Sequence, residues 1–336
     1  MDIIQLLQSL PVECRREILL FVFKSPHKGL GVGLLKNKLK DYYLNIPDND
    51  KDVISFDKDT ISFDSHEHIY ISKIIDIYLL TCFDNLEKID LSDTRVTGDI
   101  ENLRLLQKLS WIDLYNTWVN GNIENLNTNL KLTNICLNRT EVTGDISHLS
   151  LLLNLIEISM TKTNVNGDIF YLKSLKNLTF LCLGETSVTG DIVHLKSLHN
   201  LNIIDLRTSQ VTGNIAHLKS LHNLNIIDFS RTLVSGNIAH LKSLKKLNII
   251  DFSRTLVSGN IVDLKSLQNI NQIYLDNTGV TGNIIDLKSL RNLACIELNN
   301  TNVTGNIIDL KSLRNLTCIE LNNTNVTGNI DLLGCL

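Results

Sequence analysis

The stretch Gly213-Asn214-Ile215-Ala216-His217-Leu218-Lys219-Ser220-Leu221-His222-Asn223-Leu224-Asn225-Ile226-Ile227-Asp228-Phe229-Ser230-Arg231-Thr232-Leu233-Val234-Ser235 is one unit of a repeat that fills most of the chain. Its leading glycine recurs every 23 residues without insertion or deletion, at Gly98, Gly121, Gly144, Gly167, Gly190, Gly213, Gly236, Gly259, Gly282, Gly305 and Gly328. A fixed period of this length is typical of stacked units that bury their apolar faces only against one another. The chain is therefore predicted to be a solenoid rather than a compact globule.

The spacing of apolar residues changes within each unit. From Ile215 to Leu224 they recur every third residue, which is the spacing of a 3₁₀-helix rather than of an α-helix. From Ile227 to Phe229 they alternate, as in a strand whose other residues point away from the core. Each unit is thus predicted to hold a short strand, a turn and a tight helical return.

Stacking such units pairs their strands in parallel. We expect eleven strands, from the one with Ile89 and Leu91 to the one with Ile319 and Leu321. At about 4.8 Å per strand the sheet would be about 50 Å long. Because the helical side is bulkier, the stack is expected to curve into an arc with the sheet on its concave face and the helical returns on its convex face.

Two columns of small residues have predicted structural roles. The repeated glycine permits a positive φ or a close approach to the next coil. A hydroxyl column at the strand ends is expected to satisfy loop backbone groups. It consists of Thr94, Thr117, Thr140, Thr163, Thr186, Ser209, Thr232, Thr255, Thr278, Thr301 and Thr324.

The pattern Leu224-x-x-Ile227-x-Phe229-x-x-Thr232-x-Val234 resembles the leucine-rich repeat, with Thr where that family has Asn or Cys. Val211 to Ile215 is similar to the Gly-x-Ile part of the plant-type subclass, although the unit is one residue shorter and no Pro follows. The resemblance implies a right-handed solenoid that binds proteins or peptides on its concave face. Whether the second sheet of the plant-type subclass forms is left open by these departures.

Composition limits the class of protein. The net charge of −4 does not favour nucleic acid as a partner, and no apolar run is long enough for a membrane span. The first residues lack the features of a signal peptide, and the seven cysteines have no framework spacing. We therefore expect an intracellular, cytoplasmic protein with reduced thiols, the nucleus being the alternative. Cys295 and Cys318 occupy the same outward strand position in neighbouring units, where a disulfide is geometrically conceivable but not expected.

Residues 1–65 lack the repeat and are predicted to form a helical segment, whereas residues 66–336 form the solenoid. The stretch Leu10-Pro11-x-Glu13-x-x-x-x-Ile18-Leu19-x-x-Val22 resembles the opening of an F-box. That resemblance implies that residues 10–23 dock on an adaptor of a cullin-type ubiquitin ligase. The alternative is a small helical cap that packs Ile18, Leu19 and Phe23 on the first coil.

Two features are predicted between this segment and the first full repeat. The echoes Ile54-Ser55-Phe56-Asp57 and Ile61-Ser62-Phe63-Asp64 predict either a hairpin or two edge strands. Leu80 and Phe83 are in phase with the later helical leucines, so a degenerate first unit is expected there.

The outward strand positions supply the candidate binding residues. One column is acidic at seven of its eleven positions: Asp90, Asp113, Cys136, Ser159, Cys182, Asp205, Asp228, Asp251, Tyr274, Glu297 and Glu320. Neighbouring carboxylates at this spacing repel by about 1 kcal/mol per pair in water, which favours a basic partner. The alternative is a solvated row partly neutralised by Arg207, Arg231 and Arg254.

An apolar column, formed by Phe180, Ile203, Ile226 and Ile249, runs beside the acidic one. Contiguous exposed apolar rows mark binding sites. With Asp205, Asp228 and Asp251 they form a predicted apolar and acidic strip.

A second predicted patch holds Trp111, Asp113, Tyr115 and Trp118, a group that includes both tryptophans of the chain. It is the best single anchor for a partner on the concave face. The alternative is that Trp118 packs onto the neighbouring coil.

No catalytic, cofactor or metal site is predicted. Repetition places like residues side by side, whereas catalysis needs unlike groups that converge. His194, His217 and His240 stack in one column without cysteine partners, so they do not indicate a metal site.

We expect a non-enzymatic scaffold that binds a protein or peptide, the alternative being an F-box-type substrate receptor. The stretch from Gly328 to Leu336 has no polar capping unit, which predicts either end-to-end self-association or a longer natural protein.

Overall fold

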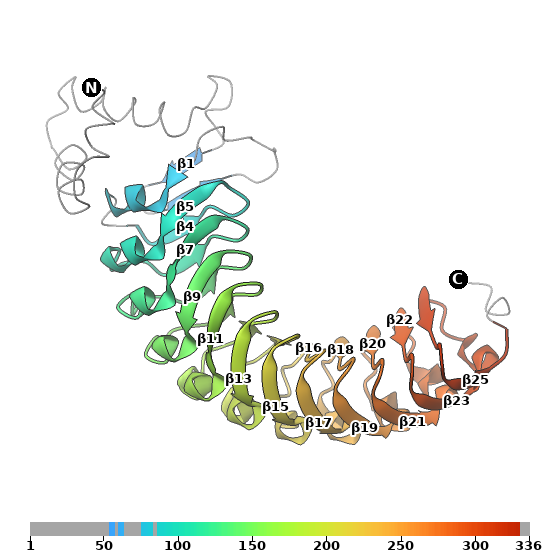
Figure 1. Ribbon diagram of the computed structural model, residues 1–336. Helices are drawn as coiled ribbons and strands as arrows, with labels where there is room; N and C mark the ends of the chain where they lie inside the picture. The colour runs from blue at the N-terminus through green and yellow to red at the C-terminus, as the bar shows by residue number, and fades with distance from the viewer. Residues whose placement is uncertain (1–53, 58–59, 64–74, 83–85, 330–336) are drawn as a thin grey trace, which may run out of the picture.

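The computed structural model describes residues 54–57, 60–63, 75–82 and 86–329, which form an arc of stacked units (Figure 1). Of residues 1–65, which were predicted to form a helical segment, only two short strands at 54–57 and 60–63 are described. The F-box-like stretch and the residues of the alternative helical cap lie outside the described part of the chain. None of the described helices has the length and apolar character needed to cross a membrane.

A thirteen-stranded sheet, sheet A, contains one three-residue strand from each of the eleven repeats and lines the concave side of the arc (Figure 1). The eleven strands are β4 (Lys88–Asp90), β6 (Trp111–Asp113), β8 (Asn134–Cys136), β10 (Glu157–Ser159), β12 (Phe180–Cys182), β14 (Ile203–Asp205), β16 (Ile226–Asp228), β18 (Ile249–Asp251), β20 (Gln272–Tyr274), β22 (Cys295–Glu297) and β24 (Cys318–Glu320). They are parallel, and each residue pairs with the one 23 positions on, as Ile227 does with Ile250. The predicted number of strands and their direction are confirmed.

A second parallel sheet, sheet B, has twelve strands and follows the loops that leave sheet A. Its strands are β3 (Ile75–Asp76), β5 (Val96–Asp99), β7 (Trp118–Asn122), β9 (Glu141–Asp145), β11 (Asn164–Asp168), β13 (Ser187–Asp191), β15 (Gln210–Asn214), β17 (Leu233–Asn237), β19 (Leu256–Asn260), β21 (Gly279–Asn283), β23 (Asn302–Asn306) and β25 (Asn325–Thr327). The second sheet, which the sequence left open, therefore forms although no proline follows the isoleucine. Its register is staggered, since Gly213 pairs with Val234, 21 positions on, whereas sheet A pairs residues 23 apart.

Short 3₁₀ helices return the chain to the next strand of sheet A, as the three-residue spacing predicted. In the described part of the chain they are η1 (Ile77–Cys82), η2 (Ile100–Leu105), η3 (Ile123–Leu126), η4 (Ile146–Leu149), η5 (Ile169–Ser174), η6 (Ile192–Ser197), η7 (Ile215–Leu218), η8 (Ile238–Ser243), η9 (Ile261–Ser266), η10 (Ile284–Ser289) and η11 (Ile307–Leu310). From η2 on, the Asp or Asn that follows each repeated glycine caps the helix. In η6, for example, Asp191 Oδ1 accepts the amide of Val193 at 2.7 Å.

One continuous apolar core runs through the stack. Leu103, Leu126 and Leu149 occupy the same position in successive units and are fully buried. The strand residues Ile227 and Phe229 are also fully buried, whereas Ile226 and Asp228, which alternate with them, are partly exposed. The alternation predicted for each strand is confirmed.

The repeated glycines need both properties predicted for them. Their φ angles lie between 100° and 122°, a region that residues with a Cβ rarely adopt. Each also lies against the helix-capping side chain of the preceding unit, so an added Cβ on Gly144 would be 2.1 Å from Asn122 Oδ1. Glycine is therefore required for backbone conformation and for packing.

The hydroxyl column also has its predicted role. Thr232 is buried, and its Oγ1 donates to the carbonyl of Phe229 at 2.6 Å. The other column members make the same bond three residues back, at 2.6–2.8 Å. Each hydroxyl satisfies a carbonyl at the turn that leaves sheet A.

The amino-terminal edge of sheet A ends in a hairpin. β1 (Ile54–Asp57) pairs antiparallel with β2 (Thr60–Phe63), and β2 pairs in parallel with β4. A hairpin, not two separate edge strands, therefore extends sheet A. The degenerate first unit is confirmed by β3 and η1, whose Ile77 and Leu80 are buried, while Phe83 lies outside the described residues.

Candidate functional site

The predicted apolar column forms a continuous row on the concave face. Phe180, Ile203, Ile226 and Ile249 begin β12, β14, β16 and β18, and each is the direct partner of the next in sheet A. All four side chains are partly exposed, although they are surrounded by a fully buried core. The strip therefore offers an apolar surface at the centre of the arc.

The acidic residues of the strip lie two positions further along the same strands. Asp205, Asp228 and Asp251 are direct register partners. Burial raises the pKa of Asp205 to about 6, and the charge of Asp228 adds to this effect while Arg207 opposes it. The pKa of Asp251 is also raised, mainly by burial. Like charges and partial burial make these carboxylates costly to ionise.

Arg207 partly neutralises this column. Its Nη1 lies 3.1 Å from Asp205 Oδ2 and 3.5 Å from Asp228 Oδ2, and its Nε lies 3.5 Å from Glu185 Oε1. The side chain of Arg207 is 38% exposed, so these pairs are only moderately screened by solvent.

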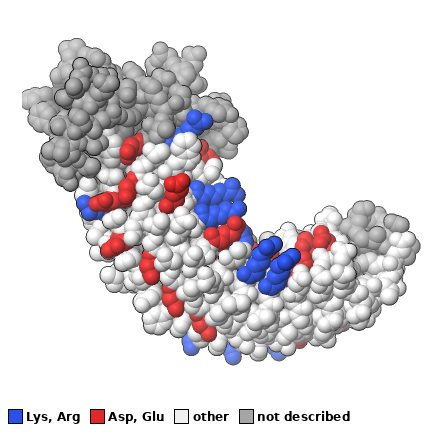
Figure 2. Space-filling view, in the orientation of Figure 1, with Lys and Arg blue, Asp and Glu red and all other residues white. Residues whose placement is uncertain are grey.

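Arg231 and Arg254 do not join Arg207 in neutralising the acidic column. Both have positive φ angles, 57° and 58°, in the turn between the two sheets, and neither forms an ion pair with the residues described here. The alternative of an acidic row partly neutralised by arginines thus holds for Arg207 alone. Asp251 has no basic partner in the described chain. Figure 2 shows blue side chains gathered in the inner bend of the arc, red ones spread over the amino-terminal half, and a further red group nearer the carboxy-terminal end.

The tryptophan patch is divided between two sheets. Trp111 begins β6 on the concave face and is 37% exposed, whereas Trp118 begins β7 of sheet B and is 53% exposed. The prediction had placed Trp118 on the concave face with the others. The left-handed turn at Asn116, with φ 53°, directs the chain out of sheet A before Trp118 is reached.

The rest of that patch remains on the concave side. Asp113 ends β6, and burial is the main cause that raises its pKa. The Tyr115 ring lies 5.9 Å from the guanidinium carbon of Arg139, within reach of a cation–π contact. Trp111, Asp113 and Tyr115 are the predicted anchor that the structure keeps together.

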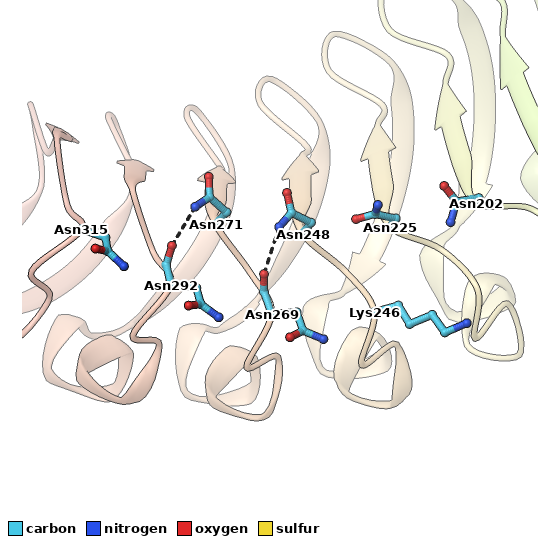
Figure 3. A pocket seen from close by; sticks show the side chains of 8 residues that line it. All are labelled: Asn202, Asn225, Lys246, Asn248, Asn269, Asn271, Asn292 and Asn315. Atoms are coloured by element: carbon cyan, nitrogen blue, oxygen red, sulfur yellow. Dashed lines mark hydrogen bonds between the residues drawn. The ribbon is translucent and has the colours of Figure 1, made fainter.

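A polar groove on one flank of the arc was not predicted. It has a volume of about 500 Å³, and seven of the eight side chains that line it are asparagines (Figure 3). Asn248 Nδ2 donates to the carbonyl of Asn269 at 3.1 Å, and Asn271 Nδ2 to that of Asn292 at 2.7 Å. These amides link the start of a sheet A strand to the loop of the next unit, which gives them a structural role.

Another unpredicted feature is a column of left-handed residues other than glycine. Their φ angles lie between 53° and 58°, at Asp93, Asn116, Arg139, Lys162, Glu185, Thr208, Arg231, Arg254, Asn277, Asn300 and Asn323. This turn separates sheet A from sheet B in every repeat. Because its residue types vary widely, the sequence carries no compositional signal for it.

Comparison with known proteins gives information at the level of structure. No protein-family model matches the chain, and no curated protein matches its sequence. Solved structures do match. The ectodomain of the Arabidopsis thaliana receptor kinase GASSHO1/SCHENGEN3 has 24% identity and a TM-score of 0.62 over 77% of this chain and 38% of its own.

Two further structures agree with it. The ectodomain of the Arabidopsis receptor kinase HAESA has 23% identity and a TM-score of 0.67 over 76% of this chain and 44% of its own. A leucine-rich-repeat protein of Leptospira interrogans has 19% identity and a TM-score of 0.61 over 75% of this chain and 65% of its own. The chain thus spans less than two thirds of the length of each. Together with the two sheets and the 3₁₀ returns, these likenesses show that the chain has the leucine-rich-repeat solenoid fold.

Proposed function

We propose that this protein is a non-enzymatic scaffold that holds an extended, basic and partly apolar segment of a partner protein across β14, β16 and β18. The observation that carries the proposal is the pairing of two rows in register. Ile203, Ile226 and Ile249 lie beside one another on the same strands as Asp205, Asp228 and Asp251. An apolar row beside an acidic row suits a segment that alternates apolar and basic side chains.

Electrostatics supports a cationic partner. Burial, together with the charge of Asp228, raises the pKa values of Asp205 and Asp251 and makes these carboxylates costly to ionise. A lysine or arginine of the partner between Asp228 and Asp251 would supply positive charge in a partly desolvated setting, where it is worth more than in water.

Two of the neighbouring structures support a peptide or protein as the ligand. The HAESA ectodomain was solved with a peptide hormone, and the GASSHO1/SCHENGEN3 ectodomain with CASPARIAN STRIP INTEGRITY FACTOR 2. The ubiquitin-ligase hypothesis depends on residues 10–23, outside the described chain, and it stays a prediction. The intracellular location and end-to-end association also stay predictions.

The proposal is tested with two labelled synthetic peptides, one alternating lysine with leucine and one alternating glutamate with leucine. Fluorescence polarisation should show that the full chain binds the lysine peptide more tightly and that added salt weakens this binding. The Asp228→Lys/Asp251→Lys variant should bind it at least about tenfold more weakly.

A matched control is Asp286→Lys, which makes the same charge change on η10, away from sheet A. It should leave binding unchanged. Equal affinity for the two peptides, or full affinity in the double variant, would remove the basis for this proposal.

A further inference from the structure

Two cysteines and a glutamate converge near the carboxy-terminal end of the concave face. Cys295 and Glu297 are the first and third residues of β22, so both side chains point to the same side of the sheet. Cys318 begins β24 and is the direct register partner of Cys295. The strand period and the 23-residue register together bring three potential ligands to one place.

The contacts show that these side chains are directed toward one another. The thiols of Cys295 and Cys318 each donate to the same oxygen, Glu297 Oε1, with sulfur–oxygen distances of 3.9 Å. The two sulfurs and the carboxylate oxygen all lie within 4.8 Å of one another. Cys295 is buried and the other two are partly exposed, so an ion could reach the site from the concave side.

Further carboxylates make the surroundings attractive to a cation. Oxygens of Asp276, Glu297 and Glu320 also lie within 4.8 Å of one another. The pKa of Glu297 is raised, first by burial and then by the charges of Asp276 and Glu320. Within the described chain, no lysine or arginine forms an ion pair with any of the three.

We propose that Cys295, Cys318 and Glu297 bind a thiophilic divalent metal ion of the Zn²⁺ type, with water completing a tetrahedral site. Two thiolates and a carboxylate are ligands that Zn²⁺ prefers, at about 2.3 Å for sulfur and 2.0–2.2 Å for oxygen. A tetrahedral ion with those bonds holds its sulfurs about 3.8 Å apart. The three ligand atoms already lie within 4.8 Å of one another, so the sulfurs are within about 1 Å of this spacing.

Binding exchanges protons for the ion. A cysteine binds a metal ion through its thiolate, so a thiol gives up its proton when the ion binds. Each ion that binds through both sulfurs releases two thiol protons to the solvent, and the affinity rises with pH for that reason. No electrons are transferred, and the metal keeps its charge.

The test uses the full chain, reduced and then freed of reductant under nitrogen. It is titrated with Cd²⁺ while the ultraviolet sulfur-to-metal charge-transfer band is recorded, and with Zn²⁺ in a calorimeter. We expect uptake at the site with release of about two protons per ion, measured in buffers of different ionisation enthalpy. Cys318→Ser should weaken Zn²⁺ binding by on the order of 100-fold, and Glu297→Gln by about tenfold.

Cys182→Ser is the matched control, because Cys182 lies on the same face at the end of β12, in a unit distant from this site. It should leave both titrations unchanged. A Cys295→Ser/Cys318→Ser variant with the uptake and absorption band of the parent chain would overturn the proposal. The proposal would also fail if mass spectrometry detected a disulfide between these two cysteines in the parent chain and the reduced chain took up no metal at the site.

Discussion

Gly213 lies directly against the side chain of Asp191 in the preceding unit, and a Cβ on Gly213 would be only 2.2 Å from Asp191 Oδ1. That same oxygen accepts the amide of Val193 and so caps η6. The absence of a side chain in one unit therefore makes room for the helix cap of the unit before it. The relationship recurs at each repeated glycine, which explains why this residue is needed every 23 positions.

Gly213→Ala is expected to destabilise the chain by about 2–4 kcal/mol, because it combines backbone strain at φ 112° with displacement of the Asp191 cap. Urea denaturation followed by circular dichroism measures the change. Gly279→Ser is the control, since Gly279 has no positive φ and a Cβ added to it would lie 3.2 Å from its nearest neighbour, Ser258 Cβ. An equal loss in both variants would contradict this explanation.

Thr208→Asn is expected to stabilise the chain by about 0.5–1 kcal/mol, because Thr208 is a β-branched residue at φ 55° and asparagine tolerates that region better. The side chain is exposed, so packing should change little. Thr212→Asn, at an exposed position in β15, should give no such gain because strands favour threonine. Thermal unfolding of the two variants against the parent separates these effects, and a lower melting temperature for Thr208→Asn would show that the turn is unstrained.

Asn129→Leu is expected to stabilise the chain by about 1–2 kcal/mol. Asn129 is fully buried at a position where the next unit has Leu152, and its Oδ1 has no hydrogen-bond partner among the described residues. Its amide donates to the carbonyls of Leu103 and Leu106, which also accept backbone amides and so remain paired without it. Denaturant midpoints would decide the matter, and a destabilised Asn129→Leu would mean that the amide contributes more than the apolar contact.

Asp205 is expected to make the stability of the chain fall as the pH rises from about 4 to about 6. Its folded-state pKa is raised from 3.8 to about 6, so in this window the native state binds more protons than the unfolded state. The free energy of unfolding then decreases with pH and levels off above the raised pKa. Asp205→Asn should make this slope shallower by the share that Asp205 contributes, whereas Asp286→Asn on η10 should keep it unchanged. Unfolding midpoints at several pH values provide the measurement, and parallel pH profiles for the parent and Asp205→Asn would rule out the assignment.

The sequence predicted those features that follow from spacing alone. The three-residue and two-residue periods identified the 3₁₀ returns and the strands, because a fully buried core tolerates no change of phase at positions such as Leu224 and Ile227. The glycine and threonine columns were predicted because φ preference and hydroxyl bonding are local properties. The asparagine or aspartate after each glycine caps its own helix through a local bond, whereas its contact with the glycine of the next unit depends on stacking.

Other features depended on how far the chain turns between the two sheets. Arg207 comes two residues after Asp205 and lies near the carboxylates, whereas Arg231 and Arg254 come three residues after their aspartates and fall in the left-handed turn. Trp118 was separated from Trp111 by the same turn. Sheet B could not be predicted, since most of its strands contain a glycine and they pair in a staggered register that no single unit encodes.

The unbroken 23-residue period has a consequence for how such a molecule can change in length. Residues 213–235 and 236–258 differ at only two positions, His222/Lys245 and Asn223/Lys246. Excision of residues 236–258 would join Ser235 to Gly259 and recreate the Ser258–Gly259 junction. The arc can thus lose or gain whole modules, as recombination between near-identical gene segments would produce, while the surviving units keep their 23-residue phase.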